Sequence, residues 1–292
     1  MTRWLVRFGF DGRPFAGWAR QPGRRTVEGE IRGALARCGI APDPAAARLE
    51  VASRTDRGVS ARANALALSS DLDGRSLLHA LNGVAPEIFF THATEVPEAF
   101  RVRTPLWREY RYYLPLERTD RGRWPAWFPW FTGSPIDLRS FARGVASGTP
   151  VRRPIDEMEL LDVGGTPVFR IRAPGFLWGM VRKIVSALEA VGEDRIPPAT
   201  LFAALQGRAR LTVPLAPAEP LVLWEVAHGV PFSLANERWP RRQGQYFRSE
   251  YELARSRERL LRELPLLEDG GAAAPPRPSR RQDVGPRRPS GR

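Results

Sequence analysis

Alternation of apolar and polar residues predicts strands at several places along the chain. Trp4, Val6, Phe8 and Phe10 recur at every second position, which is the period of a half-buried strand. This first strand ends at Asp11-Gly12, a turn signal. Similar patterns predict a strand on each side of residue 56 and further strands at residues 108–114, 168–172 and 221–226.

A different period predicts helices. The clearest helix has one apolar stripe ended by Gly192, and the stripe consists of Leu177, Val181, Ile184, Val185, Leu188 and Val191. Thr26 is placed to cap another helix that carries Ile31, Ala34 and Leu35 on its apolar face. Shorter helices are predicted at residues 76–81 and 137–146, and residues 121–131, rich in Trp and Pro, are predicted to be a loop.

The last sixty residues differ from the rest of the chain. Residues 249–264 predict a helix, with Ser249 and Glu252 at the spacing of a capping box. Residues 270–292 are rich in Pro, Arg, Gly, Ala and Ser, a composition that predicts disorder.

Charge points to a polyanionic partner. The 292 residues carry a formal net charge of +13. Residues 270–292 hold six arginines and one aspartate, so they contribute +5 and leave +8 on the first 269 residues. The folded part is thus basic by itself, which favours a polyanionic partner. Lys183 is the only lysine among the 45 basic residues, and the others are arginines. A bias in genome composition explains this excess of arginine over lysine.

Other classes of protein are disfavoured. The chain has no run of about 18 apolar residues, so we expect no membrane span. Its N-terminus lacks the long apolar block of a signal peptide. Cys38 is the only cysteine, which excludes an intramolecular disulfide and disfavours a cysteine-based zinc site. We therefore expect a cytoplasmic protein without a bound metal.

Candidate chemistry centres on the loop Arg54-Thr55-Asp56-Arg57-Gly58. Neighbouring guanidinium groups favour the ionised form of the Asp56 carboxyl group, which suits a nucleophile or base acting on a polyanion. Taken alone, the loop is better explained as a turn aspartate between solvated arginines, and only the rest of the chain favours the catalytic interpretation. The three histidines are far apart, and no glycine-rich loop matches a nucleotide-binding fingerprint. We expect no cofactor.

Seven motifs follow one another along most of the first 230 residues. They are Phe10-Asp11-Gly12 with Phe15, Gly17-Trp18, Gln21 and Thr26-Val27-Glu28; Arg54-Thr55-Asp56 with Gly58-Val59; Asn82, Pro86 and Ile88; Phe100 and Arg103; Arg108, Tyr110 and Tyr112; Met180-Val181-Arg182 with Ile184-Val185 and Gly192; and Ala216-Pro217 with Leu221 and Leu223. In these residues and in their order the chain resembles the tRNA pseudouridine synthase A family. Ser60 stands where that family usually has a histidine.

The resemblance implies an α+β pseudouridine synthase fold. That fold has two similar α+β halves, a mixed or antiparallel sheet and an active-site cleft between the halves. We assign residues 1–104 to the N-terminal half with the aspartate loop and residues 105–232 to the C-terminal half with the tyrosine strand and the arginine helix. Residues 233–269 would form a C-terminal extension and residues 270–292 the basic tail.

The resemblance also implies roles for individual residues. Asp56 would be the essential carboxylate, adding to the base or the sugar or abstracting a sugar proton; the sequence leaves these routes open. Tyr110 would stack on the flipped uracil and help move the C5 proton. Arg182 would pair with Asp56 in a bidentate manner. Contacts with RNA are assigned to Arg54, Arg57, Arg62, Arg103 and Arg108.

The implied function is isomerisation of uridine to pseudouridine in the tRNA anticodon stem-loop, at positions 38 to 40, by a homodimer. A non-catalytic RNA-binding protein on the same fold and a structural partner in an RNA–protein assembly are the alternatives. Asp56, Tyr110 and Arg182 together argue against the first alternative, whereas the basic tail would suit the second.

Overall fold

The computed structural model of the chain describes residues 1–40, 47–115, 121–236 and 241–263. Residues 1–246 form one compact unit, and a second unit begins at Phe247. The basic tail, residues 270–292, lies outside the described residues. No helix among the described residues is both long and apolar enough to cross a bilayer.

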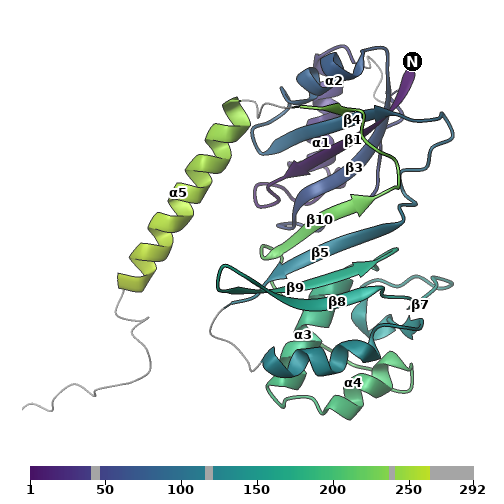
Figure 1. The fold of residues 1–292 in the computed structure, drawn as a ribbon, viewed down its shortest axis with the longest axis vertical. Coiled ribbons are helices and arrows are strands. Elements are labelled where there is room, and N and C mark those ends of the chain that lie inside the picture. Colours follow the sequence, from purple (N-terminus) through teal and green to yellow (C-terminus); the bar gives the residue numbers. More distant parts are fainter. Residues whose placement is uncertain (41–46, 116–120, 237–240, 264–292) are drawn as a thin grey trace, which may run out of the picture. The chain divides into compact units, whose positions relative to one another are not determined.

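A single mixed sheet runs through the first unit (Figure 1). Its strands follow the order β11-β4-β1-β3-β10-β5-β9-β8, with β2 paired to β3. The contact between β10 and β3 is parallel, and the other pairs in this sheet are antiparallel. The strands are β1 (Thr2–Phe10), β2 (Glu50–Val51), β3 (Ser60–Ser70), β4 (Ile88–Glu95), β5 (Trp107–Tyr113), β8 (Glu157–Val163), β9 (Thr166–Ala173), β10 (Leu221–Ala227) and β11 (Leu234–Ala235).

These findings confirm the α+β class and the mixed, mostly antiparallel sheet. The strands predicted at residues 108–114, 168–172 and 221–226 are β5, β9 and β10. Strand β10 is late in the sequence but lies between β3 and β5, so it joins the early strands to the later ones. Ala61, Leu223 and Tyr110 are consequently neighbours across three adjacent strands.

Helices accompany each part of the sheet. The helix α1 (Val27–Arg37) begins at Thr26, whose hydroxyl accepts a hydrogen bond from the Gly29 N–H, as predicted. Helix α2 (Gly74–Leu81) starts two residues earlier than predicted because Asp73 caps it. In the later half lie α3 (Met180–Gly192) and α4 (Pro198–Leu205) (Figure 1). Leu177 precedes α3, and Gly192 is its last residue.

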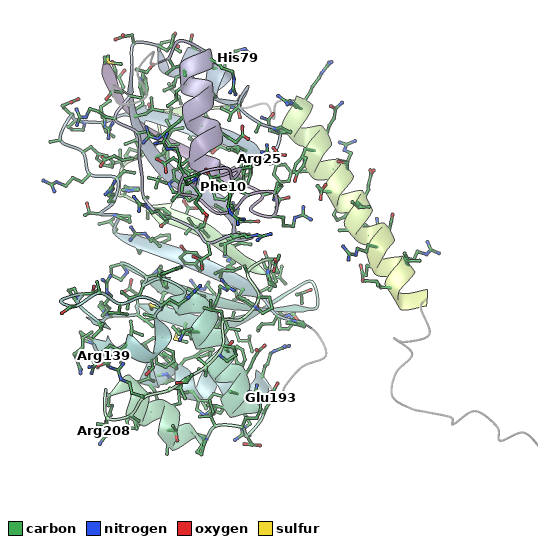
Figure 2. The ribbon with its side chains drawn as sticks, turned by 180° about the vertical axis from the view of Figure 1, so that it is seen from behind. Phe10, Arg25, His79, Arg139, Glu193 and Arg208 are labelled. Carbon is green, nitrogen blue, oxygen red and sulfur yellow. The ribbon has the colours of Figure 1, made fainter. Side chains whose placement is uncertain are left out.

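Figure 2 shows how sequence position maps onto this arrangement. Phe10, Arg25 and His79 lie in the part with α1 and α2, whereas Arg139, Glu193 and Arg208 lie in the part with α3 and α4. The division of the chain into halves at residues 104 and 105 stays a prediction.

Two local predictions are wrong. Residues 121–131 are not an irregular loop, because Arg121–Trp130 forms the 3₁₀ helix η1, with Trp124 fully buried. Residues 137–146 do not form an α-helix. The strand β6 (Ile136–Asp137), which pairs with β7 (Arg152–Arg153), is followed by one 3₁₀ turn, η2 (Arg139–Phe141). The Asp137 carboxylate accepts the Arg139 backbone N–H, a local bond that competes with a helix.

The predicted helix at residues 249–264 exists but starts earlier. Helix α5 spans Arg241–Glu263, so Ser249 lies inside it and the predicted capping box is wrong. Several elements were not predicted, among them β4, β8, β11 and α4. In the strands β4 and β8, buried and exposed side chains do not alternate regularly, and that alternation is the signal by which sequence analysis finds a strand.

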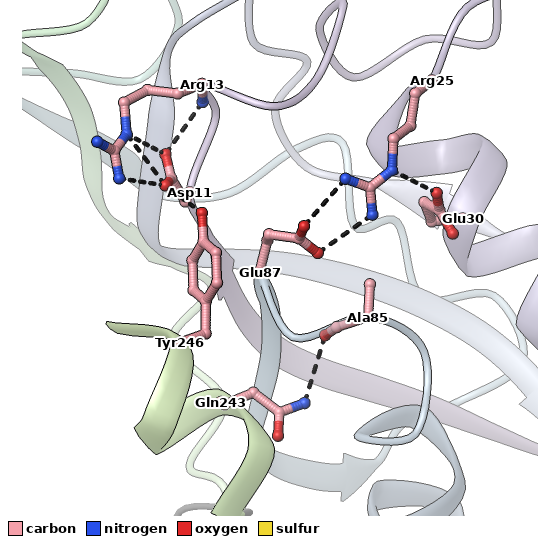
Figure 3. A network of polar contacts seen from close by, with 8 residues as sticks. All are labelled: Asp11, Arg13, Arg25, Glu30, Ala85, Glu87, Gln243 and Tyr246. Carbon is pink, nitrogen blue, oxygen red and sulfur yellow. Dashed lines mark hydrogen bonds and ion pairs between the residues drawn. The ribbon is translucent and has the colours of Figure 1, made fainter. Parts of the chain in front are cut away.

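The first turns of α5 are anchored by buried polar contacts (Figure 3). Gln243 is fully buried, and its Nε2 donates to the carbonyl oxygens of Asn82 at 2.7 Å, Ile88 at 3.2 Å and Ala85 at 3.4 Å. The Tyr246 hydroxyl donates to Asp11 Oδ2 at 2.7 Å. Burial acts to raise the pKa of Asp11, but hydrogen bonds from Arg13 and Tyr246 outweigh it and lower that pKa below its usual value. Residues far apart in sequence thus fix the start of this helix.

Candidate active site

Asp56 lies in the loop between β2 and β3, where the early strands meet β10. The Val59 N–H donates to the Asp56 carbonyl at 3.2 Å and closes a turn in which Gly58 has a φ of +83°. A side chain at that position would be strained. The Trp18 N–H donates to the Thr55 carbonyl at 3.1 Å. The loop that follows β1 therefore holds the aspartate loop from one side.

Arg182 reaches Asp56 from α3. Its Nη1 donates to Asp56 Oδ2 at 3.2 Å, and its Nε donates to the Ala216 carbonyl at 2.6 Å. The Arg182 side chain is 14% exposed and the Asp56 side chain 25% exposed. The pairing predicted from sequence is confirmed, but it is not bidentate, because the second donor holds the segment before β10. Arg182 thus links the carboxylate, the helix and that segment.

Trp178 holds the other oxygen of the same carboxylate. Its indole Nε1–H donates to Asp56 Oδ1 at 2.7 Å. The residue precedes α3, and its side chain is 54% exposed. Sequence analysis did not identify Trp178. Its only signal was position, because it stands four residues before Arg182 on the segment that leads into the helix.

Tyr110 lies on β5 and is almost completely buried, at 8% exposure. Its ring meets the Phe176 ring edge to face, with 4.9 Å between centroids. Burial raises the pKa of the Tyr110 hydroxyl to about 12; the Asp56 charge adds to that rise, whereas Arg108 and a hydrogen bond with Ser53 oppose it. The hydroxyl therefore stays protonated at neutral pH and lies within electrostatic reach of Asp56.

Arg108 is committed to protein contacts. It donates to Ser53 Oγ at 2.7 Å and to the carbonyl oxygens of Ala52 at 2.8 Å, Arg103 at 3.1 Å and Pro174. Burial lowers the pKa of its guanidinium. The structure thus gives Arg108 a role in joining β5 to the segment before Asp56, and the RNA contact assigned to it stays a prediction.

The other arginines assigned to RNA lie in different surroundings. Arg54 and Arg57 are exposed on both sides of Asp56. Arg103 is exposed, with its Nε 3.7 Å from Glu50 Oε1. Arg62 lies over the Trp224 ring, 4.6 Å from its centroid, and 3.6 Å from Glu225. Of this set, Arg54 and Arg57 are placed beside the carboxylate.

The site thus brings the three predicted catalytic residues together from three elements. It holds a carboxylate between two N–H donors, within electrostatic reach of a protonated and buried phenol. Such a set can supply a nucleophile or base and a proton carrier without a metal. Among the described residues, no cluster of His, Cys, Asp and Glu has the arrangement of a metal site.

Comparison with known proteins identifies the family. A family model described as tRNA pseudouridine synthase matches residues 133–228. The tRNA pseudouridine synthase A of Pyrococcus horikoshii is 35% identical over 263 residues, which cover 88% of this chain and 95% of that protein. The chain belongs to the tRNA pseudouridine synthase A family.

Another relative in this family is the tRNA pseudouridine synthase A of Thermococcus sibiricus, which is 36% identical over 236 residues, or 80% of this chain and 87% of that protein. A solved structure titled "Crystal Structure of a Cbf5-Nop10-Gar1 Complex" aligns with 63% of this chain and 53% of its own, at 13% identity and a TM-score of 0.30, which is too distant to inform on function. Family membership makes the chain an isomerase, and the resemblance found in the sequence is confirmed.

Proposed function

We propose that this tRNA pseudouridine synthase isomerises uridine at positions 38 to 40 of the tRNA anticodon stem-loop. The observation that carries this proposal is the Asp56 carboxylate, which accepts a hydrogen bond from Arg182 at 3.2 Å and whose charge acts on the buried hydroxyl of Tyr110. The net charge of +13 supports binding to a polyanion. The choice of stem-loop rests on the motifs that match the family.

The reaction conserves all atoms of the nucleoside. The N1–C1′ bond breaks, the uracil rotates, a C5–C1′ bond forms, and C5 loses its proton while N1 gains one. No oxidant or energy source is needed. Asp56 either adds to the base, adds to the sugar, or abstracts a sugar proton on a glycal route, and its two anchored oxygens suit each of these roles.

Tyr110 supports the last step in this proposal. A hydroxyl with a pKa near 12 is protonated at neutral pH, so it acts as a relay that receives the C5 proton while passing on its own. Its aromatic ring, held by Phe176, offers a face for an extruded base. Arg54 and Arg57, exposed beside Asp56, are placed to contact the RNA backbone.

The test is site mapping on tRNA. Carbodiimide labelling and primer extension on tRNA treated with the purified enzyme should show pseudouridine at one or more of positions 38 to 40. A control tRNA with cytidines at these three positions should remain unmodified. Modification confined to another arm of the tRNA would contradict the proposed target.

We also propose a cytoplasmic homodimer. A single exposed cysteine, Cys38, suits a reducing compartment, and the dimer is expected from the family resemblance. Light scattering of the purified protein, after size-exclusion chromatography, should give twice the 32.7 kDa mass of one chain. A monomeric mass across the working concentration range would contradict the dimer.

A further inference from the structure

Both oxygens of the Asp56 carboxylate are held by N–H donors from one segment of the chain. Arg182 donates to Oδ2 and Trp178 donates to Oδ1. The Arg182 bond involves the residue that the family motif supplies. The Trp178 bond is shorter, at 2.7 Å against 3.2 Å, and nothing in the motif or in the proposed function accounts for it.

The position of Trp178 is unusual for a structural tryptophan. Its side chain is 54% exposed, whereas tryptophan is highly buried on average. Burial of the ring therefore explains little of its placement. The polar end of the indole points at Asp56, and an exposed tryptophan with its single donor bound to a carboxylate is more easily explained by the site than by the core.

The surroundings fix the indole in place. The Arg143 guanidinium lies 4.5 Å from the ring centroid, and the Arg143 backbone N–H donates to the Trp178 carbonyl at 2.9 Å. Gly144, at a φ of +53°, lies under the ring, where an added Cβ would come within 3.2 Å of it. A close-packed backbone and a stacked cation thus hold both the main chain and the ring of Trp178.

We propose that Trp178 is a positioning residue, which fixes the orientation of the Asp56 carboxylate for pseudouridine formation. The carboxylate of an aspartate can rotate about its Cβ–Cγ bond over a broad range of angles. A hydrogen bond to only one of its oxygens therefore leaves the carboxylate free to turn. A second donor on the other oxygen stops that motion. This inference rests on the proposed function.

The chemistry of the indole suits this role and excludes others. Its nitrogen is a donor only, so Trp178 neither accepts a proton nor competes with Asp56 as a base. Each carboxylate oxygen has two lone pairs, so Oδ1 and Oδ2 each keep one for the substrate. A precisely held reacting group accelerates a reaction without contributing to substrate affinity.

The test separates rate from binding. Trp178→Phe keeps a ring and loses the N–H. Its single-turnover rate at saturating tRNA should fall about 10- to 100-fold, as expected for loss of a hydrogen bond to a charged group, with the Kd for tRNA within about twofold of the wild type. Trp178→His restores a donor on a smaller ring and should recover part of the rate. Trp130→Phe is the matched control, because that ring packs on Phe202.

The outcomes are distinct. Wild-type rate in Trp178→Phe overturns the inference, and so does a loss confined to Kd. If the single-turnover rate falls equally in Trp178→Phe and Trp178→His, the N–H group is not what positions the carboxylate. Thermal melting followed by circular dichroism shows whether each variant is folded. If Trp178→Phe melts early, the single-turnover rate of Trp178→His is compared with that of the wild type instead. A wild-type protein that modifies tRNA outside positions 38 to 40 contradicts the proposed target and leaves the inference on Trp178 open to the same measurement.

Discussion

Arg182 and Asp56 are 126 residues apart in sequence, yet a single hydrogen bond of 3.2 Å joins their side chains. The bond connects a loop that precedes β3 to the first turn of α3. It forms because β10 brings the early and late strands into one sheet. The Asp56 carboxylate is therefore positioned by the fold as a whole.

Asp56→Asn should abolish pseudouridine formation, with a loss of at least about 1,000-fold, because an amide cannot act as the nucleophile or base. The amide also offers one acceptor oxygen to two donors, Arg182 and Trp178. Release of tritium from tRNA labelled at uridine C5 measures the reaction, and filter binding should show tRNA affinity near the wild type. Asp162→Asn, at an exposed turn, is the charge-matched control. Turnover near wild type in Asp56→Asn would refute the assignment.

Arg182→Lys should lower turnover by about 100-fold. One ammonium group cannot reproduce the fixed fork that holds Asp56 through Nη1 and the Ala216 carbonyl through Nε. Turnover and thermal melting should be compared in the same preparation. Arg195→Lys, an exposed arginine beyond α3, should leave both unchanged. If Arg182→Lys melts early but works normally at low temperature, Arg182 is structural only.

The sequence marked the candidate site more clearly than it marked some of the local structure. Asp56, Tyr110 and Arg182 were proposed because each belongs to a motif. The structure shows Arg182 and Tyr110 interacting with Asp56, and the catalytic roles of the three residues stay predictions. Trp178 was missed, because its bond to Asp56 depends on where a loop ends in space. The helix predicted at residues 137–146 was wrong for a related reason. Its composition allowed a helix, but pairing of β6 with β7 and the bond from the Arg139 N–H to Asp137 decided otherwise.

Tyr110→Phe should keep the ring against Phe176 and lose the hydroxyl. If the hydroxyl moves only the C5 proton, cleavage of the N1–C1′ bond survives and a stalled species accumulates, which denaturing gels and mass spectrometry of the tRNA would detect. Tyr110→Ala should lose both the stacking face and the hydroxyl, and with them all activity. Tyr113→Phe, on the same strand but only partly buried, is the control. An Ala variant as active as wild type would make Tyr110 a core residue.

The raised pKa of Tyr110 also predicts how stability depends on pH. Burial raises this pKa to about 12 in the folded protein, against about 10 in an unfolded chain. The stabilisation is complete below pH 10 and is lost as pH rises towards 12, because the unfolded chain then releases a proton that the folded protein keeps. The free energy of unfolding should fall by about 2 kcal/mol more in the wild type than in Tyr110→Phe between pH 9 and 12.

Chemical denaturation of both proteins across this range measures the difference. Burial raises the pKa of Tyr112 to about 12 as well, but Tyr112 is present in both proteins, so its contribution cancels. Parallel curves for wild type and Tyr110→Phe would show that the phenol ionises in the folded protein as easily as it does in the unfolded chain.

Gln243→Ala should destabilise the protein by about 1 to 3 kcal/mol, because it removes the donor that the Asn82, Ala85 and Ile88 carbonyl oxygens share and leaves them in a buried site. Gln243→Glu should cost more, since it turns an acceptor-only group towards those oxygens. Gln245→Ala, two residues away and exposed, tests whether loss of any glutamine from α5 has the same effect. Urea unfolding of the three variants gives the comparison. Equal stability of Gln243→Ala and Gln245→Ala would show that the buried amide does not hold the start of α5.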